Sequence, residues 1–331
     1  MSSPAQRWKV WWTTRTCPSP ASSCLRITKN YNADVYRQKI LAALREQSFD
    51  AVFLAPCSSS HVKVDKEFLD AAGKNLKVIS TMTSGYDHLD LTLIKERGIK
   101  AGHAPKVLSA AIAEMAVLLL LSAARRAREG RKKLENCEIS TGPQWLLGRD
   151  LRGSTVGIFG LGNIGQEIVK RLKAFEVGKF IYTGRVPSRK KEDEELGAEY
   201  VSWDKLLEQS DFLVISAPLT SKTQKLFEDD AFEKMKEKKP VFVNVARGEI
   251  VDTAALQRAL CKMKIFAAGL DVTDPEPLPR KHELLKLRNV EILPHLGSST
   301  IKTRDDMAKV AALNIINVLA GKDLEYAIPL P

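Results

Sequence analysis

Short apolar runs alternate with longer amphipathic segments in the first part of the chain. These runs are WKVWWTT (8–14), DAVFLAP (50–56), LKVISTM (76–82) and GIKAGH (98–103). The last three are separated by stretches that are long enough for crossover helices. This alternation predicts a parallel sheet with helices on both faces.

A second set of apolar runs begins at Thr155 and repeats the alternation. Its members are TVGIFG (155–160), KFIYTG (179–184), FLVISAP (212–218), VFVNVA (241–246), FAAGLDV (266–272) and VEILPH (290–295). Six such runs with helices between them predict a complete doubly wound domain. Between the two sets, Ala104-Pro105 breaks the chain, and we expect a long apolar helix from about Val107 to Arg128 that crosses between lobes.

The sequence GLGNIG opens the second set, directly after the strand-like TVGIF and before the helical QEIVKRLKAF. In this setting G-x-G-x-x-G is typical of a dinucleotide-binding turn. Its first glycine allows the tight turn, its second lets the pyrophosphate approach the backbone, and its third lets helix pack on strand. The N–H groups at the helix start face the phosphates. The predicted cofactor contacts here are Gly160, Gly162, Asn163, Ile164 and Gly165.

This glycine motif lies in the middle of the chain, which sets the predicted domain organisation. A dinucleotide domain of residues 106–297 is inserted into a substrate domain of residues 1–105 plus 298–331. The segment after His295 predicts a last helix that returns to the first lobe and is stopped by Gly321 as a C-terminal cap. The predicted fold class is α/β, with two doubly wound parallel-sheet lobes: a Rossmann nucleotide domain and a flavodoxin-like substrate domain.

The strand-like run KFIYTG ends where such folds place an Asp or Glu on the ribose 2′-hydroxyl of the dinucleotide. This chain has Gly184-Arg185 there, followed by Ser188 and three basic residues. A guanidinium beside small and hydroxyl residues holds a 2′-phosphate with charge-assisted hydrogen bonds, whereas a carboxylate repels it. The pattern therefore predicts NADPH, with Arg185 and Ser188 as contacts. The alternative is that Arg185 only lies on the surface.

Three polar residues follow strand-like runs of the second set: Arg247 in NVARGEIVD, Glu276 in GLDVTDPEPLP and His295 in VEILPHLGSST. Doubly wound folds place their ligands at this edge of the sheet. A histidine can donate a proton near neutral pH, and a neighbouring carboxylate stabilises its imidazolium. An arginine binds a carboxylate through two hydrogen bonds and polarises an adjacent carbonyl. Each residue alone is compatible with a structural turn, but together they favour hydride transfer to a 2-oxo acid.

Composition and net charge limit the classes of molecule that this chain is expected to bind. The chain has 331 residues, 44% hydrophobic and 27% charged, and a net charge of +11. Its basic clusters, RRAREGRKK (125–133) and KMKEKK (234–239), include glutamates and accompany no nucleic-acid motif, so we expect solvated helix faces and no nucleic-acid partner. A positive field suits a small anionic substrate and a phosphate-rich cofactor.

No compartment signal or metal motif is visible. The most apolar stretch, MAVLLLLSAA (115–124), is too short to cross a bilayer, so no membrane role is expected. Five scattered cysteines without CxxC spacing indicate reduced thiols, a cytoplasmic location and no metal site.

The motifs GLGNIG, NVARGEIVD, GLDVTDPEP and LPHLGSST resemble those of the D-isomer-specific 2-hydroxyacid dehydrogenase family, and the resemblance covers nearly the whole chain. It implies that Arg247, Glu276 and His295 are catalytic residues, and that Arg247 and His295 also bind the substrate. It implies further that the backbone amides of Ser84-Gly85 bind the substrate carboxylate. Family members contact the nicotinamide end through residues that match Pro218, Val245, Asp271 and Gly297. They are typically homodimers joined through their nucleotide domains.

Within the family, LKVISTMTSGYDHLD, YTGR and FEKMK resemble the animal reductases of glyoxylate and hydroxypyruvate, which prefer NADPH. The implied reactions are glyoxylate to glycolate and hydroxypyruvate to D-glycerate. Two departures leave a larger 2-keto acid such as 2-ketogluconate open: Ser84-Gly85-Tyr86 replaces Val-Gly-Ile, and Thr141 stands where those enzymes have a tryptophan. A dinucleotide-sensing co-repressor-like scaffold is the third alternative, and Arg185 disfavours it because those proteins use an acidic ribose contact.

Overall fold

The computed structural model describes residues 10–12, 33–55, 62–140, 142–185 and 194–331. The chain divides into two compact units. Unit 1 consists of the residues up to Leu108 together with Thr300–Pro331, and unit 2 is Ser109–Ser299. Ser188, Thr141 and part of the FLAPCSSSHVKVD loop lie outside the described residues.

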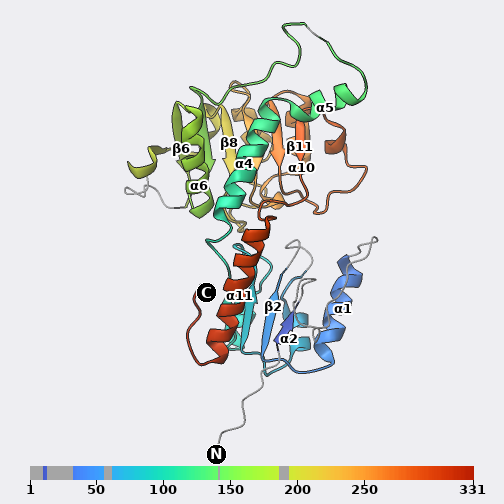
Figure 1. The fold of residues 1–331 in the computed structure, drawn as a ribbon, viewed down its shortest axis with the longest axis vertical. Helices are drawn as coiled ribbons and strands as arrows, with labels where there is room; N and C mark the ends of the chain where they lie inside the picture. Colours follow the sequence, from blue (N-terminus) through green and yellow to red (C-terminus); the bar gives the residue numbers. More distant parts are fainter. Residues whose placement is uncertain (1–9, 13–32, 56–61, 141, 186–193) are drawn as a thin grey trace, which may run out of the picture. The chain divides into compact units, whose positions relative to one another are not determined.

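Unit 1 contains a parallel sheet whose described strands follow one another in chain order. These strands are β1 (Val10–Trp12), β2 (Ala51–Leu54), β3 (Val78–Thr81) and β4 (Lys100–Gly102). Its helices are α1 (Ala33–Arg45), α2 (Lys66–Ala72), α3 (Leu91–Glu96) and α11 (Ile301–Leu319). Figure 1 shows α11 on one side of this sheet and α1 with α2 on the other. The flavodoxin-like strand order stays a prediction, because no reversal of order occurs among the described strands.

The helix α11 packs on β2, β3 and β4. Met307, Ala311 and Ile315 are buried at a spacing of four residues, so they form one apolar face. The Oγ1 of Thr300 accepts the N–H of Thr303 at 3.1 Å and caps the start of the helix. Gly321 follows the end of the helix at φ +76°, as the sequence predicts for a glycine cap.

Unit 2 contains a seven-stranded parallel sheet in the order β11-β10-β9-β8-β5-β6-β7. Its strands are β5 (Thr155–Phe159), β6 (Lys179–Thr183), β7 (Ala198–Tyr200), β8 (Phe212–Ile215), β9 (Val241–Asn244), β10 (Ala267–Leu270) and β11 (Val290–Ile292). Its α-helices are α4 (Ser109–Ala124), α5 (Ala127–Glu135), α6 (Asn163–Leu172), α8 (Trp203–Gln209), α9 (Asp229–Lys234) and α10 (Thr253–Cys261). The order of the strands reverses between β5 and β8, which is where open α/β sheets bind ligands.

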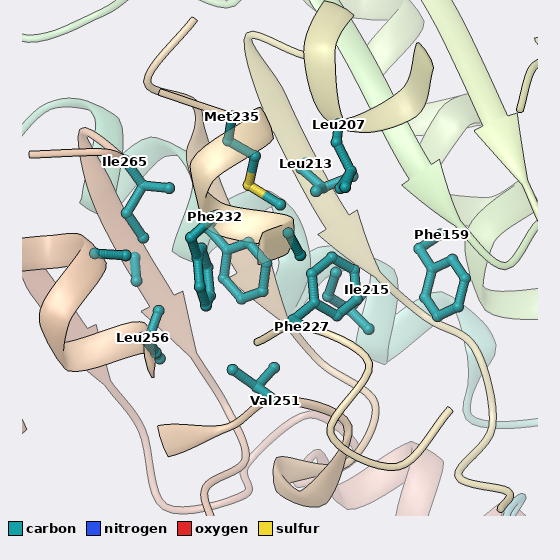
Figure 2. Close-up of a cluster of buried hydrophobic side chains, with 14 of the residues drawn as sticks. Phe159, Leu207, Leu213, Ile215, Phe227, Phe232, Met235, Val251, Leu256 and Ile265 are labelled. Carbon is teal, nitrogen blue, oxygen red and sulfur yellow. The ribbon is translucent and has the colours of Figure 1, made fainter. Parts of the chain in front are cut away.

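The core of unit 2 explains why its strands read as continuous apolar runs. All residues of β8, β9 and β10 are buried, because helices cover both faces of the sheet. Figure 2 shows one of the two clusters in this unit, where Phe227 lies beside Ile215 and Phe159. The Phe227 ring makes edge contacts with Phe159 at 5.5 Å and with Phe242 at 5.2 Å.

The predicted class, α/β with parallel sheets, is confirmed, but two elements differ from the sequence prediction. The strand β7 was not predicted, because its three residues AEY are too few to show a period. The long helix predicted to run to about Arg128 ends at Ala124, and Arg126 adopts a left-handed φ of 54° before α5 begins. The carbonyl oxygen of Ala124 accepts the N–H of Arg149 at 3.0 Å, so a backbone group from a distant segment binds the carbonyl at the end of the helix.

No helix among the described residues is long and apolar enough to span a membrane.

Candidate active site

The glycine turn between β5 and α6 is packed closely against its surroundings at two of its three glycines. Gly160 has φ +97°, and a Cβ added there would lie 2.7 Å from the backbone of Ala217. A Cβ on Gly165 would lie 2.4 Å from the carbonyl oxygen of Gly160. Ser216 donates its hydroxyl to that same oxygen at 2.7 Å and ties the turn to the end of β8. Neither glycine position can therefore take a side chain without displacing backbone.

Gly162 differs from the other two glycines, because nothing lies within 4 Å of a Cβ added there. It is the N-cap of α6, and no side chain caps this helix start. Asn163 and Ile164 form the first turn, so its N–H groups and the positive end of the helix dipole face open space. This open helix start is compatible with a bound pyrophosphate, and the contact of these residues with the cofactor stays a prediction.

Arg185 lies two residues beyond the end of β6, and its side chain is exposed. Gly184 adjoins the phosphate turn, since a Cβ added there would lie 3.8 Å from the Cα of Gly160. The guanidinium thus extends from a strand end that borders the turn. Ser188, the second predicted contact for a 2′-phosphate, lies outside the described residues.

Arg247 lies in the turn after β9, where it is half-buried. The buried side chain of Asn244 holds this turn: its Nδ2 donates to the carbonyl of Arg247 at 2.8 Å, and its Oδ1 accepts the N–H of Ala246 at 3.0 Å. Gly248 packs so closely that a Cβ would lie 2.1 Å from the carbonyl of Thr273. The turn after β9 therefore touches the loop after β10.

Glu276 lies in that loop, and His295 follows β11, which neighbours β10 in the sheet. The Nδ1 of His295 lies 2.8 Å from the Oε1 of Glu276. Both side chains are partly exposed, at 27% and 19%, so solvent and a small molecule can reach the pair. Two hydroxyl groups hold the Glu276 loop: Thr253 donates to the carbonyl of Asp274 at 2.7 Å, and Thr273 donates to that of Pro275 at 2.8 Å.

Four further predicted cofactor contacts lie at the same sheet edge. Pro218 follows β8 and is exposed, whereas Val245 follows β9 and is buried. Asp271 follows β10 and Gly297 lies after β11. Asp271 is buried, and this burial raises the pKa of its carboxyl group, although backbone N–H groups and nearby His295 oppose the shift. The turns after strands β5, β6, β8, β9, β10 and β11 thus all carry predicted site residues.

The predicted substrate loop, Ser84-Gly85, lies in unit 1 after β3. Its carbonyl groups are occupied: Nδ1 of His103 lies 2.8 Å from the oxygen of Ser84, and the hydroxyl of Thr83 donates to that of Gly85 at 2.6 Å. Within the described part of the chain, no acceptor takes the backbone N–H groups of Ser84, Gly85 and Tyr86. Consecutive N–H groups of this kind suit a carboxylate.

His103 was not among the predicted site residues. Burial lowers the pKa of its imidazole, and the hydrogen bond with Ser84 offsets this only partly. The ring is therefore neutral at pH 7, with Nδ1–H donating to Ser84. Its edge contact with Tyr86, at 5.4 Å, adds a second link to the loop. Neither link is visible in the sequence, since His103 is separated from the loop by a helix and a strand.

A dinucleotide cradle, an arginine and a histidine–carboxylate pair on one edge of a Rossmann sheet are the parts of a nicotinamide-dependent dehydrogenase. Residues 117–297 match the model of the D-isomer specific 2-hydroxyacid dehydrogenase NAD binding domain. The chain belongs to the D-isomer-specific 2-hydroxyacid dehydrogenase family. The predicted membership and the prediction of an enzyme are confirmed, and the cofactor is confirmed as a nicotinamide dinucleotide.

Named relatives extend this similarity. The glyoxylate reductase/hydroxypyruvate reductase of Homo sapiens is 51% identical over 268 residues, which cover 81% of each chain. The glyoxylate reductase of Thermofilum pendens is 38% identical over 319 residues, which cover 94% of this chain and 91% of that one. The crystal structure of a Thermus thermophilus protein is 35% identical with a TM-score of 0.83, over 97% of this chain and 100% of that chain.

Proposed function

We propose that this protein reduces small 2-oxo acids with NADPH, converting glyoxylate to glycolate and hydroxypyruvate to D-glycerate. The observation that carries the proposal is the 2.8 Å pair of His295 and Glu276 at the edge that holds the phosphate cradle. The names of the relatives in Homo sapiens and Thermofilum pendens support the choice of substrates.

His295 is the proposed proton donor. Its Nδ1 faces Glu276, so Nε2 is the ring nitrogen that remains to give a proton to the substrate oxygen. Glu276 fixes the ring orientation and stabilises the imidazolium before the transfer. When bound, the reduced nicotinamide supplies a hydride to the carbonyl carbon, so the C=O bond becomes CH–OH. The proton leaves His295 and is replaced from solvent, to which the ring is partly open.

Arg247 and the Ser84-Gly85 loop are the proposed anion-binding groups. The guanidinium of Arg247 can bind the substrate carboxylate and polarise the keto oxygen. The N–H groups of Ser84 and Gly85 supply a second set of donors for a carboxylate. We therefore propose that unit 1 is the substrate domain and unit 2 the dinucleotide domain.

The preference for NADPH rests on Arg185. The chain has no acidic residue from Lys179 to Lys191, so nothing in this segment repels a 2′-phosphate. The side chain of Arg185 is exposed just after the end of β6, and the neighbouring Gly184 borders the glycine turn. A charge-assisted hydrogen bond from the Arg185 guanidinium to the 2′-phosphate favours NADPH over NADH.

We also propose a cytoplasmic homodimer joined through unit 2. Figure 1 shows the segment after α5 looping away from the sheet of this unit. The end of α5 and the segment after it carry exposed apolar side chains that a partner can cover: Leu134, Ile139, Trp145 and Leu147. The change Leu147→Asp should convert the dimer to a monomer in multi-angle light scattering, whereas Met263→Asp, at another exposed position of unit 2, should not. A monomeric wild-type protein contradicts the proposal.

The substrate assignment is tested by steady-state oxidation of NADPH, followed by its absorbance. We expect turnover of glyoxylate and hydroxypyruvate, with pyruvate and 2-ketogluconate as comparison substrates. A kcat/KM for 2-ketogluconate above those of the two smaller acids would favour the larger-acid alternative. An absence of turnover with all four acids, in a protein that binds NADPH, would favour the scaffold alternative.

A further inference from the structure

One aspartate holds the backbone on which His295 stands. Asp271 directly follows β10, and its carbonyl oxygen accepts the N–H of His295 at 2.8 Å. Its Oδ1 accepts the N–H of Leu296 at 2.7 Å, and its Oδ2 accepts the N–H of Gly297 at 2.8 Å. Three consecutive backbone donors are thus bound by a single residue. This fixes residues 295–297 to the end of the neighbouring strand.

The fit between Asp271 and Gly297 leaves no space for another side chain. A Cβ on Gly297 would lie 2.8 Å from Oδ2 of Asp271. The side chain of Leu296 is 39% exposed, yet its amide points inward to the buried carboxylate. The contact therefore depends on an aspartate at 271 and on a glycine at 297.

His295 needs such a support because of its backbone conformation. Its φ is 55°, in the left-handed region that a residue with a Cβ adopts at a cost in free energy. From this conformation its Nδ1 reaches Glu276, which lies five residues after Asp271 on the loop from the same strand. If the segment relaxed to a right-handed or extended φ, the imidazole would turn away from the carboxylate.

We propose that Asp271 is the positioning residue of His295, acting through the backbone of residues 295–297. This adds a role inside the protein to the contact with the nicotinamide end that the family resemblance implies for the same carboxylate. The inference rests on the proposed role of His295 as proton donor. Its experiment separates the two claims.

The principal variant is Asp271→Asn, which keeps the shape but has only one acceptor oxygen for two N–H groups. We expect kcat to fall about 10–100-fold, the equivalent of one charge-assisted hydrogen bond. NADPH affinity, measured by fluorescence titration, should fall by a smaller factor than kcat, because the implied contact of Asp271 with the nicotinamide end is one of several predicted cofactor contacts. In the His295→Ala background the same change should have no further effect on kcat, because there is no imidazole left to position.

A matched control lies at the opposite edge of the same sheet. Asp211 precedes β8, and its Oδ2 accepts the backbone N–H of Thr155 at 2.9 Å. The change Asp211→Asn also removes a carboxylate that binds a backbone donor, so it reports any general loss of packing in unit 2. It should leave kcat, KM and the NADPH affinity as in the wild type.

A second pair of measurements does not depend on turnover. In spectra of the protein with isotope-labelled histidine, the side-chain signal of His295 can be assigned with His295→Ala, since the chain has only five histidines. Asp271→Asn should shift this signal, and Asp211→Asn should not. Gly297→Ala places a methyl group against the Asp271 carboxylate and so disturbs the same contact. It should also shift the His295 signal.

The outcomes are distinct. An unchanged His295 signal in Asp271→Asn overturns the positioning role, as does an equal fall in kcat with and without His295. A loss of NADPH affinity with kcat intact overturns it in favour of a cofactor contact. If the wild type reduces no 2-oxo acid but the His295 signal still shifts, the proposed function fails and the positioning role stands.

Discussion

The glycine turn after β5 in unit 2 and the loop after β3 in unit 1 are built in different ways. In the glycine turn, tight backbone approaches determine the shape, because side chains at Gly160 and Gly165 would meet backbone atoms at 2.7 Å or less. In unit 1, side chains determine it, because Thr83 and His103 bind the carbonyl groups of Gly85 and Ser84. A shape that depends on backbone approach requires particular residues at particular spacings, so it leaves a motif in the sequence. A shape that depends on a distant side chain leaves none.

The largest expected effect on kcat comes from removing His295, the proposed proton donor in unit 2. His295→Ala should lower kcat by roughly 10²–10⁴-fold, the usual contribution of a positioned general acid. NADPH affinity should change little, because the residues proposed to bind the phosphates and the ribose lie elsewhere in the unit. Single-turnover kinetics and a fluorescence titration measure the two quantities. Retained turnover would remove the proposed mechanism and leave the dinucleotide site in place.

A glycine pair tests the claim that backbone approach shapes the turn of unit 2. Gly165→Ala should lower the free energy of unfolding by about 1–3 kcal/mol, because its Cβ meets the carbonyl of Gly160. Gly162→Ala should leave the stability within about 0.5 kcal/mol of the wild type, because the space around it is open. It should instead weaken NADPH binding, since the methyl group enters the cradle. Equal stabilities of the two variants would contradict this account.

Arg185→Asp tests the exposed end of β6. The change replaces attraction for the 2′-phosphate with repulsion, so we expect the preference for NADPH over NADH to fall by about 10–100-fold. The ratio of kcat/KM for the two cofactors measures it. The exposed Arg152, in the same unit, provides a control as Arg152→Asp. Equal affinity of the wild type for NADPH and NADH would show that Arg185 does not select between the two cofactors.

His103→Phe is the corresponding test in unit 1. The change keeps an aromatic ring against Tyr86 but removes the donor to Ser84, so only the hydrogen bond is lost. We expect the KM of the 2-oxo acid to rise about 2–10-fold, the contribution of one neutral hydrogen bond. His103→Gln, which retains an N–H donor, should recover part of the loss. An unchanged KM in His103→Phe would mean that Thr83 alone shapes the loop.

The smallest expected effect is a pH dependence of stability in unit 2. Burial raises the pKa of Asp271 in the folded state, so the folded protein binds a proton there at pH values where the unfolded chain has lost it. Stability contributed by this group is therefore full below the ordinary carboxyl pKa and falls as the pH rises through the raised value. Urea unfolding over this range should show the decrease in the wild type and not in Asp271→Asn. The same slope in both proteins would assign it to other groups.

The sequence predicted the class of fold and all strands of unit 2 except β7, and the site residues that it predicted in this unit lie in turns at one edge of the sheet. It did so because apolar runs and glycine spacing record burial and backbone approach directly. The end of α4 at Ala124 was missed, since the residue that binds its last carbonyl, Arg149, lies in another part of the chain. Asn244 and His103 were missed for the same reason: both act by hydrogen bonds to turns, which a polar residue in a sequence does not reveal.

The place of α11 in the sheet of unit 1 has a consequence for biosynthesis. β2, β3 and β4 leave the ribosome before any of Ser109–Ser299, but the helix that packs on them is made only afterwards. At roughly 5–20 residues per second, the interval is on the order of ten seconds or more. During that time the apolar face of the nascent sheet has no intramolecular cover, while unit 2 can already fold. Ribosome-bound chains stalled before Ile301 should therefore be cut by protease within unit 1 and resist it within unit 2.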